Sequence, residues 1–281
     1  MKIVTTVDEL RASLAPGEGF LVPTMGNLHQ GHLSLIELAR RRADHGLRGK
    51  VVASIFVNRL QFAPTEDFDE YPRTFERDCE LLEEAGCDVL FAPEESQLYP
   101  EPQTYQVLPD PALASQLEGA SRPGFFTGVC TVVLKLFNCV QPSVAVFGKK
   151  DYQQWQVVRR MTDQLALPIE IVAGETVREQ SGLAMSSRNH YLSSKEKEQA
   201  AALYRALCEA RDCLAAGEAS AKVLEDANQY LAKSQWQPDY VELCSRNSLM
   251  PVDDYEPHRG QCVLVAAAHL GEVRLIDNLE L

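Results

Sequence analysis

The stretch that decides the fold is Phe20-Leu21-Val22-Pro23-Thr24-Met25-Gly26-Asn27-Leu28-His29-Gln30-Gly31-His32. An apolar run is followed by Pro23 and then by a helical pattern that opens around Leu33, which predicts a strand, a turn and a helix. Such a turn points unpaired backbone N–H groups and the positive end of the helix dipole at one place, where phosphate is stabilised. Gly26 and Gly31 would let the backbone approach that anion closely.

Two histidines in this stretch are candidate ligand donors. His29 and His32 lie three residues apart, so both imidazoles would project from one helix face beside the same anion. Helix capping, packing or simple exposure would explain the pair at least as well if it stood alone. A zinc site would need a third ligand, and no Cys or His at a suitable spacing is nearby.

Composition limits the possible functions. The chain has 281 residues, of which 45% are hydrophobic and 24% are charged, as in a globular protein with one large or two modest domains. Its 40 acidic and 27 basic residues give a net charge of −13, which repels nucleic acids and anionic lipid, so an anionic ligand needs a local site.

Cysteine spacing and hydropathy indicate the compartment. The eight cysteines have no Cys-x-x-Cys pair, which favours reduced, mostly buried thiols. Residues 1–14 lack the apolar core of a signal peptide, and no run of eighteen apolar residues occurs. We therefore expect a cytoplasmic protein with no membrane or nucleic-acid partner.

Residues 1–175 alternate short apolar runs with helical patterns. Strands are predicted at 20–22, 51–57, 89–91, 144–147 and 169–172. Because continuous apolar strands separated by helices form parallel sheets covered on both faces, we predict a doubly wound, Rossmann-like α/β domain. Ligands of such sheets bind beyond the carboxyl ends of the strands. Polar stretches follow three of these strands, so we expect them to meet at that edge.

Residues 176–281 have a different pattern. Helices are predicted at 193–216, with Ser193 or Ser194 as N-cap, and at 221–233. Strands follow at 240–243, 262–269 and 273–276, the last two as a hairpin. This order predicts a smaller α+β C-terminal domain, joined to the first at a seam near 174–182.

Three segments of the first domain connect these elements. Residues 63–72 form an acidic, loop-like stretch, and a helix is predicted over 71–86. The proline-rich segment 93–111 is either a lid over a site or a mere connector.

Two polar turns could bind phosphate. Gly148-Lys149-Lys150-Asp151 follows a strand, so a lysine there could reach a phosphate while Asp151 and Gln154 contact ligand hydroxyls, although a solvated charged turn is the plainer interpretation. The spacing is not that of a Walker A loop. Met185-Ser186-Ser187-Arg188 could grip a polyphosphate and close over a nucleotide at the seam, although such a run is common in surface loops.

Two further side chains could hold an acid substrate. Gln61 is the candidate amide beyond the second predicted strand, or else an ordinary turn residue. Arg122, in Arg122-Pro123-Gly124-Phe125-Phe126, precedes an apolar helix at 129–140 and could lie beside a carboxylate.

In combination these motifs closely resemble the pantoate–β-alanine ligase family. The resemblance runs in order through nearly the whole chain, at residues 23–32, 56–62, 66–74, 147–154 and 185–189. The first and last motifs are also similar to the paired signatures of class I aminoacyl-tRNA synthetases and related nucleotidyltransferases.

The resemblance implies a reaction and a set of site residues. ATP and (R)-pantoate would form pantoyl adenylate and pyrophosphate, and β-alanine would then displace AMP to give pantothenate. Gln61 and Gln154 would hold pantoate, with Gln61 also near β-alanine. His32 carries the proton-donor role, with His29 binding phosphate beside it. The implied ATP site consists of Met25, Gly26, Asn27, Leu28, His29, Gln30, Gly31, His32, Gly148, Lys149, Lys150, Asp151, Val177, Met185, Ser186, Ser187 and Arg188.

The chemistry of adenylyl transfer agrees with these roles. Negative charge builds on the α-phosphate oxygens and on the departing pyrophosphate, so catalysis is mainly positioning and charge stabilisation. The candidate catalytic donors are His29, His32, Lys150 and Arg188. Mg²⁺ bridging the phosphates is expected, with unknown protein ligands. The likeness also suggests a homodimer formed through the first domain.

Two residues depart from the family pattern. Arg59 stands where a proline is usual, which would loosen the turn that presents Gln61. Phe125 replaces a common histidine, so any polar role of that side chain is absent. The alternatives are a synthetase-like protein that acts on tRNA or adenylates another acid, and an inactive nucleotide-binding regulator.

Overall fold

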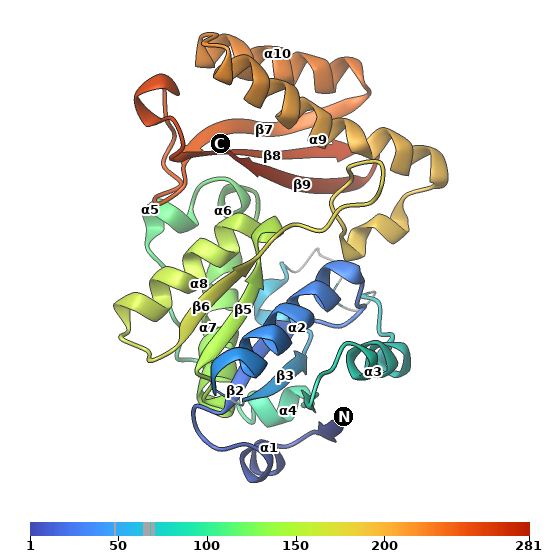
Figure 1. Ribbon diagram of the computed structural model, residues 1–281, viewed down its shortest axis with the longest axis vertical. Helices are drawn as coiled ribbons and strands as arrows, with labels where there is room; N and C mark the ends of the chain where they lie inside the picture. Colours follow the sequence, from blue (N-terminus) through green and yellow to red (C-terminus); the bar gives the residue numbers. More distant parts are fainter. Residues whose placement is uncertain (48, 64–67, 69–70) are drawn as a thin grey trace. The chain divides into compact units, whose positions relative to one another are not determined.

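The computed structural model describes residues 1–47, 49–63, 68 and 71–281, and the chain forms two compact units (Figure 1). The first contains Met1–Lys149 and Gln154–Glu175, and the second contains Lys150–Gln153 and Thr176–Leu281. Most of the acidic loop predicted at 63–72 lies outside the described residues.

The first unit is built on a parallel six-stranded sheet with the order β1-β4-β3-β2-β5-β6. This confirms the doubly wound, Rossmann-like prediction. The pattern missed β1, because three residues at a sheet edge give no detectable periodicity. The strands are β1 (Lys2–Val4), β2 (Gly19–Thr24), β3 (Lys50–Ile55), β4 (Val89–Phe91), β5 (Val144–Gly148) and β6 (Glu170–Gly174).

Helices and short helical turns connect these strands. The helix predicted from Leu33 begins at Gln30, and the one predicted from Val129 begins at Phe125. The helices are α1 (Val7–Ser13), α2 (Gln30–Arg42), α3 (Phe75–Glu84), α4 (Glu95–Leu98), α5 (Pro111–Ala114), α6 (Glu118–Ser121), α7 (Phe125–Val140) and α8 (Tyr152–Gln164), and the short turns are η1 (Ala43–Leu47), η2 (Arg59–Gln61) and η3 (Lys149–Asp151).

Both faces of the sheet are covered, as the apolar strands require. Val144 and Val146 of β5 share a buried cluster with Ile36 of α2 and with α3. The next residue, Phe147, points to the opposite face, where its ring packs edge-on against Phe137 of α7. Strands buried on both sides explain why the sequence reads as unbroken apolar runs.

The sheet has a switch point beside β2. The chain runs from β2 through α2 to β3 on one side, whereas β5 pairs with the other side of β2. In open parallel sheets the crevice beyond such a point is the usual ligand site. Because β2 and β5 are parallel neighbours, the loop after Thr24 and the end of β5 at Gly148 lie at the same edge of the sheet.

The second unit contains an antiparallel sheet with the order β7-β8-β9, and α9 and α10 pack on it. Both helices and the β8–β9 hairpin were predicted. Ser193 caps α9 in a capping box with Glu196, and small alanines let α9 approach the sheet closely. The elements are η4 (Ser187–Tyr191), α9 (Ser194–Ala215), α10 (Ser220–Lys233), β7 (Trp236–Ser245), η5 (Glu256–His258), β8 (Cys262–Leu270) and β9 (Val273–Glu280).

All eight cysteines are unpaired, as their spacing predicts. Burial raises the pKa of Cys87 to about 11 and those of Cys130 and Cys244 to about 12, so these thiols stay protonated and unreactive. Within the described part of the chain, no helix combines the length and the apolar character needed to cross a membrane.

Candidate active site

The loop between β2 and α2 is bent by two consecutive residues in the left-handed region. Gly26 has φ 82° and Asn27 has φ 51°. A Cβ at Gly26 would lie 3.1 Å from Oδ2 of Asp78, so the glycine is needed both for its φ and for this close approach. Asn27 tolerates the conformation better than most residues.

A buried carboxylate holds this loop in place. Asp78 of α3 is 1% exposed, and its oxygens accept the backbone N–H groups of Asn27 at 2.9 Å and Leu28 at 2.8 Å. Thr74 donates to it at 3.1 Å. The expectation of unpaired N–H groups in this turn is therefore wrong for Asn27 and Leu28. Asp78 was not predicted, because one acidic residue in a charged helix gives no distinguishing signal.

The two histidines form the N-terminal cap of α2. His29 is the N-cap, and its Nδ1 accepts the N–H of Gly31 at 3.1 Å, while Nδ1 of His32 accepts the N–H of His29 at 3.3 Å. The ring centroids are 4.1 Å apart. Since each Nδ1 is an acceptor, this network assigns the proton of each neutral ring to Nε2. Capping and ligand binding are thus compatible roles, carried by different nitrogens.

Gln61 is brought to Met25 by a buried amide network. Gln61 donates through Nε2 to Met25 Sδ at 3.1 Å, and its Oε1 accepts from Asn58 Nδ2 at 3.2 Å. Asn58 is 1% exposed; it also donates to Gly128 O and accepts from the Tyr99 hydroxyl at 2.9 Å. Neither Asn58 nor Tyr99 was predicted as a site residue, although Asn58 lies in the motif that contains Gln61.

Helix α7 presses directly on the turn that carries Gln61. A Cβ built on Gly128 would lie 2.3 Å from the carbonyl oxygen of Leu60 and 2.8 Å from the nitrogen of Gln61. Only glycine allows this distance, so Gly128 fixes the position of η2. The turn keeps its 3-10 form with Arg59 in place of proline, and the Arg59 guanidinium lies 3.9 Å from the Phe68 ring centroid.

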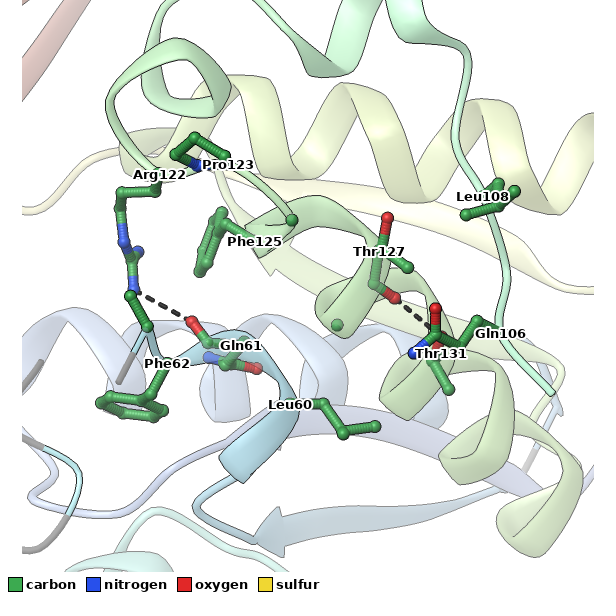
Figure 2. Close-up of a pocket in the computed structure, with 13 residues that line it drawn as sticks. Leu60, Gln61, Phe62, Gln106, Leu108, Arg122, Pro123, Phe125, Thr127 and Thr131 are labelled. Carbon is green, nitrogen blue, oxygen red and sulfur yellow. Dashed lines mark hydrogen bonds between the residues drawn. The ribbon is translucent and has the colours of Figure 1, made fainter. Parts of the chain in front are cut away.

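A cavity of about 360 Å³ lies between η2 and the start of α7 (Figure 2). The Arg122 guanidinium stacks on the ring of Phe125 at 3.8 Å and donates to the carbonyl oxygen of Gln61 at 3.1 Å. Gln106 and Leu108 line the cavity, and the backbone N–H of residue 107 donates to Thr131. The segment predicted as lid or connector therefore supplies part of this wall.

The turn after β5 places its two lysines differently. Lys149 Nζ lies 2.6 Å from Glu175, within the first unit. Lys150 belongs to the second unit, where its Nζ is 3.7 Å from Asp151 and its side chain is 19% exposed. Gly148 ends β5, and Gln154 is half-buried near the start of α8. The Nζ atom of Lys150 is therefore farther from its neighbouring carboxylate, at 3.7 Å, than the Nζ atom of Lys149, at 2.6 Å.

A narrow hairpin in the second unit brings together Val177 and Met185. The N–H of Met185 donates to the carbonyl of Val177 at 2.9 Å, and Arg178 bridges to Ala184 in antiparallel fashion. Ser186 then caps η4 by accepting the N–H of Arg188 at 3.2 Å, and the Arg188 side chain is exposed. The segment 185–188, which the sequence predicts to bind a polyphosphate, therefore begins in the hairpin at Met185 and continues into η4.

The described residues contain no group of three or more His, Cys, Asp or Glu side chains that could hold a metal ion. The candidate donors are instead imidazole, ammonium, guanidinium and amide groups. Such a set suits an anionic ligand that brings its own cation.

The doubly wound sheet and the imidazole-bearing loop at its switch point define an enzyme of the nucleotide-binding α/β class. The chain belongs to the pantoate–beta-alanine ligase family, whose model matches residues 2–280.

Individual relatives agree over the full length. A pantothenate synthetase from Leptothrix cholodnii is 58% identical over 287 residues, covering 100% of both chains. The crystal structure of pantothenate synthetase from Thermus thermophilus matches with a TM-score of 0.93 and 47% identity, covering 100% of this chain and 99% of that one. A pantoate–beta-alanine ligase from Francisella tularensis, complexed with beta-gamma ATP and beta-alanine, matches with a TM-score of 0.80 and 30% identity, covering 100% and 97%.

Proposed function

We propose that the protein uses ATP to condense (R)-pantoate with β-alanine to pantothenate, through pantoyl adenylate, and releases AMP and pyrophosphate. The family assignment supports this reaction. The structural observation that carries it is the pair of imidazole rings at the start of α2, beyond the carboxyl end of β2, each of which accepts a backbone N–H through Nδ1.

In the first half-reaction a pantoate carboxylate oxygen attacks the α-phosphorus of ATP, and the bond to pyrophosphate breaks. His29 and His32 donate through Nε2 to phosphate oxygens, with the dipole of α2 behind them. Lys150 and Arg188 neutralise the charge that develops on the α-phosphate and the leaving group. The Met25–His32 loop, the 148–151 turn, Val177 and residues 185–188 bind the nucleotide.

The pantoate site depends on Gln61 and Gln154. Because Asn58 donates to Oε1 of Gln61, the amide of Gln61 is oriented with its Nε2 donor facing away from Asn58. That donor now contacts Met25 Sδ, a weak acceptor, so exchange for a substrate oxygen is favourable. Gln61 therefore offers an oriented donor to pantoate, and subsequently a contact for β-alanine.

The cavity beside Arg122 suits the carboxylate of an acid substrate. The guanidinium lies over the ring of Phe125 and donates to the Gln61 carbonyl, so little side-chain entropy is lost when it binds a carboxylate. In the second half-reaction the β-alanine amine attacks the acyl carbon of pantoyl adenylate and AMP leaves. As the C–N bond forms and the bond from the acyl carbon to the AMP oxygen breaks, the amine loses one proton, which is released to water.

Mg²⁺ enters this proposal as the complex of ATP, with phosphate oxygens and water as its main ligands. No step is assigned to a metal held by the protein alone. We also propose, from the family resemblance, that the protein is a cytoplasmic homodimer joined through the first unit.

The test is AMP formation by the purified protein, with pantoate and β-alanine omitted in turn. We expect AMP and pyrophosphate to require pantoate for adenylate formation, and pantothenate to require both substrates. Release of ADP would overturn the adenylate mechanism. ATP binding without turnover, insensitive to His32→Ala, would indicate the inactive regulator instead.

A further inference from the structure

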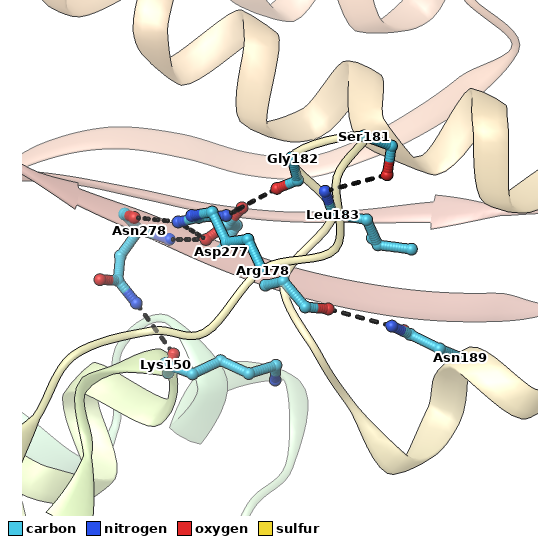
Figure 3. A network of polar contacts seen from close by, with 9 residues as sticks. Lys150, Arg178, Ser181, Gly182, Leu183, Asn189, Asp277 and Asn278 are labelled. Atoms are coloured by element: carbon cyan, nitrogen blue, oxygen red, sulfur yellow. Dashed lines mark hydrogen bonds and ion pairs between the residues drawn. The ribbon is translucent and has the colours of Figure 1, made fainter. Parts of the chain in front are cut away.

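Two consecutive residues of β9 hold both nucleotide-binding segments of the second unit (Figure 3). Successive side chains of a strand point to opposite sides. Asp277 reaches the hairpin that carries Val177 and Met185, whereas Asn278 reaches the turn that carries Lys150. Neither residue was predicted from the sequence.

The contact of Asp277 with the hairpin is a buried, two-pronged ion pair. Its oxygens lie 2.6 and 2.8 Å from the two terminal nitrogens of Arg178, and the Asp277 side chain is 3% exposed. Arg178 also donates to the carbonyl of Gly182 at 3.1 Å and lies 3.6 Å from the ring centroid of Tyr204. The guanidinium therefore ties the first strand and the turn of the hairpin to β9.

The contact of Asn278 with the Lys150 turn is made through the backbone. Asn278 Nδ2 donates to the carbonyl oxygen of Lys150 at 2.9 Å, and Asn278 is 7% exposed. The N–H of Asn278 donates to Asp277 Oδ1 at 2.8 Å, and its carbonyl accepts from Arg178 at 3.3 Å. The two contacts thus form one connected network.

We propose that Asn278 and Asp277 are positioning residues for adenylate formation: Asn278 sets the Lys150 backbone, and Asp277 sets the hairpin bearing Val177 and Met185. Neither needs to touch ATP. This inference rests on the proposed function, because it assigns Lys150, Val177 and Met185 to the nucleotide. The proposal gives a role to the buried side-chain amide of Asn278, whose Nδ2 donates to the carbonyl of Lys150.

The test is a double-mutant cycle on pantoate-dependent AMP formation, with ATP labelled on its α-phosphate so that slow variants remain measurable. Asn278→Ala should lower kcat/KM for ATP about tenfold, the fold-change that about 1.4 kcal/mol produces. In a Lys150→Ala background the same substitution should cost less than about twofold, because its effect passes through Lys150.

Two companion variants make the cycle decisive. Asn278→Asp keeps the shape but sets an acceptor against the Lys150 carbonyl, so it should be at least as slow as Asn278→Ala. Arg274 lies on the same strand as Asn278 and pairs with Asp239 of β7, so Arg274→Ala removes an ion pair far from the Lys150 turn in sequence and should keep wild-type kinetics. Thermal midpoints of Asn278→Ala and Arg274→Ala should lie within a few degrees of each other.

Equal losses from Asn278→Ala in both backgrounds would overturn the proposal, as would wild-type kinetics for Asn278→Ala and Asn278→Asp. A variant that loses activity only in proportion to its folded fraction would also count against it. Absence of pantoate-dependent AMP from the wild-type protein would instead refute the proposed function.

Discussion

The β2–α2 loop of the first unit and the 177–185 hairpin of the second are both held by a buried aspartate, but through different groups. Asp78 accepts two backbone N–H groups of its loop, whereas Asp277 pairs with a guanidinium of its hairpin. Asp78 thereby occupies two backbone N–H groups of the turn that the sequence analysis predicts as a phosphate site. The donors assigned to the nucleotide are therefore imidazole Nε2 atoms and the side chains of Lys150 and Arg188.

The largest expected effect tests whether these side chains carry the chemistry. His32→Ala in the first unit and Lys150→Ala in the second should each lower kcat for AMP formation about hundredfold, the typical cost of one preorganised donor. Steady-state kinetics with saturating pantoate measure this. Near-wild-type turnover in His32→Ala would mean that backbone groups bind the phosphate after all.

A second prediction breaks the anchor of the first loop. In Asp78→Asn the amide NH₂ faces an N–H donor, so unfolding free energy should fall by about 3 kcal/mol and kcat about tenfold. Denaturant titration and AMP release measure these effects.

A matched control for this variant is Asp88→Asn. Asp88 binds Arg40 and the N–H of Val51, at the opposite end of the strands from the loop. It should lose stability while kcat is kept. Equal kcat in both variants would contradict the positioning role of Asp78.

The third prediction concerns the packing of α7 against the turn that carries Gln61 in the first unit. Gly128→Ala places a methyl group 2.3 Å from the Leu60 carbonyl, so α7 and η2 must separate. We expect about 2 kcal/mol of lost stability and a higher KM for pantoate, with KM for ATP little changed. An unchanged thermal midpoint and an unchanged pantoate KM would show that the turn moves freely.

The smallest expected effect concerns a half-buried carboxyl of the second unit. Asp277 has a guanidinium beside it, whereas the Glu242 carboxylate has the sulfur of Cys244 at 4.0 Å. Burial raises the pKa of Glu242 above the usual 4.5. A raised pKa in the folded state favours folding below the unfolded-state value, and this advantage is lost as pH rises through the folded-state value.

Glu242→Gln should therefore raise the thermal midpoint at pH 7 by on the order of 1–2 °C, and the gain should vanish well below pH 4.5. Calorimetry at the two pH values measures this. Glu272→Gln, in the exposed β8–β9 turn, serves as the control. A gain that persists unchanged at low pH would show that charge burial is not its cause.

Local pattern predicted most of the fold, since five of six parallel strands, the capped helix α9 and the β8–β9 hairpin all have periodic or turn signals. It could not find the anchors. Asp78 lies about fifty residues from the loop it holds, and Asn278 lies 128 residues from Lys150. Such partners are brought together only by tertiary packing, so neither spacing nor composition reveals them.

Because His29 caps α2 through Nδ1, the start of the helix depends on the side chain that we assign to phosphate. Laboratory evolution for heat tolerance would thus find little freedom at this position. A replacement that caps better, such as serine or aspartate, would strengthen the scaffold while removing the imidazole. Attempts to engineer robustness should therefore begin at ordinary caps such as Ser193, where no such conflict exists.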